Sequence, residues 1–101
     1  MEMQDMLNND LLAAINYHDK ERAASVISQG ADVNASNVPG FPGYTPLLCA
    51  IDGGDIEMVR FLLRNGADAH QQTYIGGVYI TAFKYARGLG KEDMADLLQY
   101  A

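Results

Sequence analysis

The chain has 101 residues, a formal net charge of −6 and 49% hydrophobic residues, which suits one domain with its own core. Its acidic balance, without any basic run, disfavours binding to nucleic-acid phosphates or to an anionic membrane surface. The single cysteine excludes an internal disulfide, and the acidic start MEMQDMLNND predicts neither a secretory signal nor a membrane span. We therefore expect a cytoplasmic protein of one domain.

Residues 3–27 carry apolar side chains at helical spacing. The earliest of these are Met3, Met6, Leu7 and Leu11. They predict an extension of a first helix that continues through Ile15, and we expect it to cover the open end of the molecule. A frayed start with incidental methionines is the alternative. Asp19 can cap a second helix, whose inward residues are expected to be Ala23, Val26 and Ile27.

Residues 34–44, called the first finger below, combine turn-forming residues with aromatic rings. Two prolines and two glycines indicate a loop, and Phe41 and Tyr44 are its aromatic residues. Loops normally carry charges that water solvates, yet the chain has none from Val33 to Ile51. The rings therefore need a cover, which is either the rest of the molecule or a partner.

Residues 44–68 predict a pair of helices joined by a tight turn. Thr45-Pro46 is typical of a helix start, and Gly53-Gly54 ends that helix. Asp55 can cap the next helix, which Gly66 closes. The inward stripe of this second helix is expected to be Ile56, Val59, Leu62 and Leu63.

Residues 70–80, called the second finger, are also free of formal charge. Gly76-Gly77 separates two β-prone pieces, which predicts a hairpin. Its candidate contact residues are Tyr74, Ile75, Tyr79 and Ile80. All the Asp, Glu, Lys and Arg residues of the chain lie outside the two fingers.

The sequence repeats itself with an offset of 36 residues. Gly30-Ala31-Asp32 returns as Gly66-Ala67-Asp68, and the offset carries Leu11 to Leu47 and Phe83. Three copies of one helix pair then cover about residues 5–101, with units of about 5–40, 41–76 and 77–101. A repeat of this length predicts an all-α solenoid, in which each unit buries its apolar face on its neighbours.

The motif Thr45-Pro46-Leu47-Leu48-Cys49-Ala50, followed by Gly66-Ala67-Asp68, resembles the ankyrin repeat. Leu48 replaces the histidine of the family motif, and two connections are about three residues longer than the family norm. Asn9-Asp10 and Thr81-Ala82 stand where the outer units would carry Thr-Pro. The resemblance implies an ankyrin-repeat solenoid of three helix–turn–helix units with long hairpin-like fingers, a curved stack and a protein-binding role.

The resemblance also implies that the concave side binds through the ends of the inner helices. The offset gives three pairs of positions, Asn16 and Tyr17, Asp52 and Gly53, and Gly88 and Leu89. Of these, we select Tyr17, Asp52 and Leu89 as candidate contact residues. Tyr17 could instead pack on Met3 or a neighbouring helix, and Asp52 could be only a solvated charge at a helix end.

The residues that could carry chemistry do not form a catalytic pattern. His18 stands in a turn where the other units have glycine, and we expect it only to tolerate the turn conformation. His70 follows the second Gly-Ala-Asp and is expected to form a hydrogen bond in the loop. Cys49 lies within a helix, where its thiol is expected to be inert packing. Glu92 and Asp93 are adjacent and point in different directions on a helix. We expect no enzyme, no catalytic residues, no cofactor and no metal.

The function predicted from the sequence is a non-enzymatic protein-binding module. Its partner is expected to be a basic or neutral protein, with no nucleic acid and no membrane involved, and the chain alone is expected to be a monomer. Small ankyrin proteins of this kind resemble bacterial immunity proteins that inhibit a toxin or effector enzyme. A structural adaptor or self-assembling subunit is the alternative.

Overall fold

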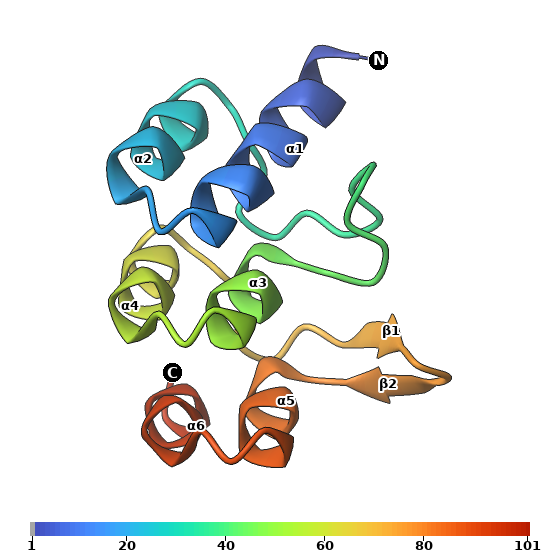
Figure 1. The fold of residues 1–101 in the computed structure, drawn as a ribbon, viewed down its shortest axis with the longest axis vertical. Helices are drawn as coiled ribbons and strands as arrows, with labels where there is room; N and C mark the ends of the chain where they lie inside the picture. Colours follow the sequence, from blue (N-terminus) through green and yellow to red (C-terminus); the bar gives the residue numbers. More distant parts are fainter. Residues whose placement is uncertain (1) are drawn as a thin grey trace.

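The computed structural model describes residues 2–101, in which six helices form three consecutive pairs (Figure 1). The first helices of the pairs are α1 (Met3–Asn16), α3 (Pro46–Asp52) and α5 (Ala82–Gly88). The second helices are α2 (Lys20–Ser28), α4 (Ile56–Arg64) and α6 (Glu92–Gln99). α1, α3 and α5 pack side by side as an inner layer, and the second helices form an outer layer. This is the all-α solenoid that the repeat predicts.

Side-chain caps set the starts of the middle helices. Thr45 Oγ1 accepts a hydrogen bond from the backbone N–H of Leu48 at 3.3 Å, and Pro46 occupies the first turn of α3. Asp55 Oδ1 accepts from the N–H of Met58 at 3.1 Å and begins α4. Both caps agree with the sequence prediction, because each satisfies a backbone donor that the helix leaves free.

The turn within each helix pair passes through a left-handed backbone conformation. Gly54 and Gly90 supply it in the second and third pairs, with φ of 66° and 76°. His18 occupies the equivalent place in the first pair with φ of 57°, as its position in the sequence indicates. A residue with a side chain adopts this conformation at an energetic cost, so other contacts must hold His18 there.

The core lies between the two layers and runs through all three helix pairs. In α4, Val59 and Leu62 are buried as predicted, while Ile56 and Leu63 are only partly buried. Met58 is also buried, with 1% of its surface exposed, and the predicted stripe omitted it. It lies four residues before Leu62 and therefore on the same helix face.

The predicted extension of the first helix is present, since α1 begins at Met3. Leu7 and Leu11 are buried on this helix, but Met3 and Met6 are 69% and 48% exposed and shield little of the end of the stack. With 14 residues α1 is the longest helix. No helix within residues 2–101 is long and apolar enough to cross a membrane.

Both fingers extend from the inner layer, away from the outer helices (Figure 1). The second finger is the predicted hairpin, in which β1 (Thr73–Ile75) pairs antiparallel with β2 (Val78–Ile80). Gly76 and Gly77 both have positive φ, which a tight two-residue hairpin turn requires. The first finger is irregular and contains one isolated bridge between Val38 and Phe41.

A ladder of polar side chains joins neighbouring units at the Gly-Ala-Asp loops. Asn34 donates to the carbonyl of Gly66 at 3.1 Å and accepts from the N–H of Asp68 at 2.7 Å. His70, which lies 36 residues further on, contacts the carbonyl of Ala101 through Nε2 at 3.1 Å. Leu48, which replaces the motif's histidine, is buried and packs in the core instead. These links between units are therefore made by loop residues.

Candidate protein-binding surface

The most exposed aromatic residues of the fingers lie on the second finger. Tyr74 and Tyr79 face each other across the strand pair, with ring centroids 5.0 Å apart and an interplanar angle of 64°. Their side chains are 57% and 69% exposed, and Val78 beside them is 58% exposed. Edge-to-face pairing restrains both rings, so the hairpin presents them in a defined orientation.

The other finger residues selected from the sequence lie closer to the body. Phe41, Tyr44 and Ile75 are partly buried and pack against the core, and Ile80 is also partly buried. The two fingers touch each other, since a Cβ added to Gly43 would lie 3.2 Å from Ile75 Cγ1. The fingers therefore combine a packed base with exposed rings on β1 and β2.

Two of the positions selected at the inner-helix ends are exposed hydrophobic side chains. Tyr17 follows α1 directly and is 83% exposed, so it does not pack on Met3 or a neighbouring helix. Leu89 follows α5 and is 47% exposed.

Asp52, the third of these positions, is exposed at the end of α3 but is fixed by two tyrosines. Tyr44 donates its hydroxyl hydrogen to Asp52 Oδ2 at 2.6 Å, and Tyr85 donates to Oδ1 at 2.7 Å. The 36-residue offset places Tyr85 at the level of Cys49, inside an inner helix, so no sequence pattern marks it as a contact residue. Only the packing of α5 against α3 brings its hydroxyl to the carboxylate.

The pKa values of both tyrosines are raised. For Tyr44 the main cause is the hydrogen bond to the Asp52 carboxylate, which favours the protonated phenol. For Tyr85 the main cause is burial, and the hydrogen bond to Asp52 adds to it. Both hydroxyls therefore stay protonated at neutral pH and continue to donate to Asp52.

A pocket of about 200 Å³ lies beside this cluster. It is lined by Asn16, Phe41, Tyr44, Cys49 and Asp52. The thiol of Cys49 is buried, and burial raises its pKa to about 12. At neutral pH it is a protonated thiol, which is a poor nucleophile.

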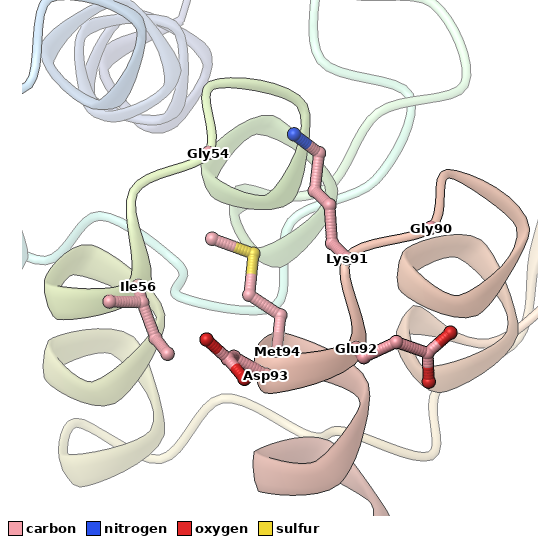
Figure 2. Close-up of a pocket in the computed structure, with 7 residues that line it drawn as sticks. All are labelled: Gly54, Ile56, Gly90, Lys91, Glu92, Asp93 and Met94. Atoms are coloured by element: carbon pink, nitrogen blue, oxygen red, sulfur yellow. The ribbon is translucent and has the colours of Figure 1, made fainter.

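Two further pockets lie on the side of the stack that carries the turns within the helix pairs. The larger, of about 470 Å³, lies between the starts of α4 and α6 (Figure 2). Glu92 and Asp93 border it with carboxylates that point in different directions, as expected from their adjacent positions (Figure 2). The second, of about 390 Å³, contains His18 and Asp55, whose Nδ1 and Oδ2 atoms are 2.9 Å apart. This contact joins the first helix pair to the second.

Possible metal ligands do not gather in the part of the chain that the structure describes. Within residues 2–101, no group of three or more His, Cys, Asp or Glu side chains could hold a metal ion. The arrangement that remains is an inner layer with exposed rings on one finger, exposed hydrophobic residues at two helix ends and one oriented carboxylate.

Stacked helix pairs with projecting fingers define a repeat protein of the solenoid class. The model of the ankyrin repeat matches residues 42–74, which include α3, α4 and the start of the second finger. The chain belongs to the ankyrin-repeat family. Ankyrin repeats are general protein–protein interaction modules without catalytic activity of their own.

Similar segments occur in larger mammalian proteins. The chain is 34% identical over 65 residues to mouse 2-5A-dependent ribonuclease, and 31% identical over 80 residues to mouse B-cell lymphoma 3 protein homolog. It is 38% identical over 68 residues to human Arf-GAP with coiled-coil, ANK repeat and PH domain-containing protein 3. These alignments cover 64%, 79% and 65% of the chain but only 9%, 17% and 8% of the relatives.

Proposed function

We propose that this protein binds another protein through a single surface, called the binding face below. It comprises Tyr17, Phe41, Tyr44, Asp52, Tyr74, Ile75, Tyr79, Ile80 and Leu89. The observation that carries the proposal is the pair of exposed rings, Tyr74 and Tyr79, on a finger without formal charge. Tyrosine is enriched and Lys and Glu are depleted in the cores of interfaces.

The geometry of the second finger favours a partner over a purely structural role for these rings. A two-stranded hairpin by itself is only marginally stable, and Tyr74 and Tyr79 leave more than half of their surface in water. Their contribution to the core of the molecule is therefore small. Because the rings are already oriented, their side chains lose little conformational entropy when a partner covers them.

Charge supports a basic or neutral partner. The net charge of −6 lies outside the fingers, so long-range attraction speeds the approach of a basic protein while contacts at the rings decide how long it stays. We expect added salt to slow association more than it accelerates dissociation. Salt-independent association would contradict this part of the proposal.

The test compares two variants of equal helical content. A partner is captured with the intact chain, identified by mass spectrometry, and its affinity measured by calorimetry. Tyr74→Ala with Tyr79→Ala is expected to weaken binding by about 30-fold or more, the effect of losing a central aromatic contact. Tyr100→Ala, which removes a ring that is 85% exposed after α6, is the control and should leave affinity unchanged. Equal affinity of the double variant and the control would refute the proposal.

The more specific role that we propose is inhibition of a toxin or effector enzyme in the cytoplasm, by an immunity-type protein that acts through binding alone. Its support is the binding face, whose exposed rings on the second finger suit the covering of an active site. Co-expression with a toxin encoded nearby should restore growth, and the Tyr74 and Tyr79 double variant should not. Growth arrest in both cases would remove this role and leave the binding function.

Self-assembly through the same rings is the competing proposal. Light scattering at micromolar concentration decides between them, because the binding function expects a monomer. A stable dimer that the Tyr74 and Tyr79 double variant dissociates would favour the self-assembling subunit.

A further inference from the structure

Three parts of the chain meet at Asp52. Tyr44 comes from the base of the first finger, Asp52 ends α3, and Tyr85 lies in the middle of α5. The two hydroxyl contacts, 2.6 and 2.7 Å long, reach different oxygens of the carboxylate. The carboxylate is thereby held in one orientation although its residue is exposed.

The hydrogen-bonding capacity left in this cluster is almost entirely that of acceptors. Each carboxylate oxygen has two lone-pair positions, and one of them receives a tyrosine hydrogen. Each hydroxyl uses its only hydrogen on Asp52 and keeps lone pairs that can accept. A ligand that completes the cluster must therefore bring donors.

The charge of Asp52 is not balanced within the molecule. In the described part of the chain, no Lys, Arg or His side chain lies within ion-pair distance of its carboxylate. The protein as a whole carries an excess of negative charge, which adds to the attraction for a cation. The complementary ligand is thus a positively charged donor.

The adjoining pocket gives the shape that this donor must have. Its volume is about 200 Å³, and it is lined by Asp52, by the aromatic residues Phe41 and Tyr44, and by Asn16 and Cys49. A guanidinium group is flat, stacks on aromatic rings and presents several N–H donors in one plane. An ammonium group lacks the flat face and is more strongly hydrated.

We propose that this pocket receives an arginine side chain of the partner protein, with the guanidinium on Asp52 and against the rings of Phe41 and Tyr44. The inference rests on the proposed protein-binding function and names one contact within it. An ordinary exposed carboxylate contributes little to binding because it must be ordered first. The two tyrosines have already ordered the carboxylate of Asp52, so its ion pair with arginine is stronger than that of an ordinary exposed carboxylate.

The proposal is tested without a partner by titrating the intact chain with N-acetyl-arginine methylamide in amide-resolved NMR. The neutral citrulline derivative of the same shape is the matched probe, and the lysine derivative is the second. The arginine probe is expected to bind in the millimolar range and to shift amides around Asn16, Phe41 and Asp52. The citrulline probe is expected to bind at least about tenfold more weakly, and the lysine probe several-fold more weakly.

Variants assign the effect to the cluster. Asp52→Asn should reduce affinity for the arginine probe at least about tenfold. Tyr85→Phe keeps the ring but loses one orienting hydrogen bond, so it should reduce affinity several-fold. Asp96→Asn, on α6, removes the same charge from an exposed position and should have no effect.

Several outcomes would overturn the proposal. They are the absence of binding up to the solubility limit of the probe, equal binding of the citrulline or lysine probe, and undiminished binding by Asp52→Asn. With a partner in hand, normal affinity of Asp52→Asn and lost affinity of the Tyr74 and Tyr79 double variant would remove the arginine pocket alone. Normal affinity of both variants would contradict both the arginine pocket and the proposed binding face.

Discussion

At the scale of single residues, Asp52 shows how little its sequence position reveals. A helix-end carboxylate is normally solvated, yet two hydroxyls from distant segments hold this one. The sequence predicts both Tyr44 and Asp52 as candidate contact residues but does not predict the hydrogen bond between them. The contact with Tyr85 depends on how closely α5 approaches α3, which no local pattern encodes.

Asp52→Asn should lower the pKa of Tyr44 towards its ordinary value of 10.0. The hydrogen bond to the carboxylate is the main cause of the raised pKa, and an amide oxygen favours the protonated phenol less. Ultraviolet absorbance of tyrosinate during a pH titration measures the change, with Tyr44→Phe to assign it. A titration curve that Asp52→Asn leaves unchanged would contradict the hydrogen-bond geometry.

Cys49 predicts a pH dependence of stability. Its pKa rises from 9.0 to about 12 on folding because the thiol is buried, so above pH 9 the unfolded chain loses a proton that the folded chain keeps. The contribution of the buried thiol to the free energy of unfolding is complete below pH 9. It is lost as the pH rises from 9 to about 12, by ~1.4 kcal/mol per pH unit. Urea unfolding at several pH values measures it, and Cys49→Ala should show a shallower decline. Parallel curves would contradict the burial of the thiol.

Asp55 and Asp19 form a matched pair for measuring the contact of His18. Each carboxylate caps a helix, but only Asp55 also contacts the His18 ring. Asp19→Ala should destabilise the fold by about 1 kcal/mol through the lost cap. Asp55→Ala should lose about 0.5 kcal/mol more, the size of a modest side-chain contact. Equal losses in urea unfolding would show that His18 does not stabilise the junction.

At the scale of elements, the helices and the hairpin could be predicted because their signals are local. Thr45, Asp55 and the paired glycines mark starts and ends within a few residues. The first finger could be predicted only as a loop. Its shape depends on contacts from elsewhere, such as the Asn9 side-chain amide donating to the carbonyl of Pro39 and the approach of Ile75 to Gly43.

The second finger should open locally when its turn is strained. Gly77 has φ of 88°, a conformation that an alanine adopts at a cost of about 1–2 kcal/mol. Gly77→Ala should therefore accelerate hydrogen exchange of the amides in β1 and β2 by about tenfold or more, and leave the inner helices unchanged. Accelerated exchange throughout the chain would show instead that the hairpin stabilises the whole fold.

At the scale of the whole molecule, the 36-residue offset predicted the stack because every unit must bury its apolar face on a neighbour. The polar ladder could be predicted only in part, because the place of His70 after Gly-Ala-Asp indicates a hydrogen bond in the loops but not its partner. Asn34 and His70 are equivalent by the offset but differ in chemistry, and His70 contacts the carbonyl of Ala101. Their roles follow only once the loops are placed beside one another.

Leu62→Asp should abolish cooperative folding. The side chain has 0% exposed surface in the core, and an unpaired carboxylate there costs several kcal/mol, a large part of the stability of a small domain. Leu89→Asp makes the same change at a side chain that is 47% exposed and should retain a normal melting curve. Circular dichroism on heating measures both, and a normal transition for Leu62→Asp would contradict the inward assignment of α4.

Binding of a protein to the finger side of the inner layer can be measured by hydrogen exchange of the chain with and without its partner. Exchange is expected to slow in β1, β2 and the end of α3 around Asp52, with α2, α4 and α6 unchanged. Protection confined to the outer helices would contradict it, because the partner would then lie on the opposite layer.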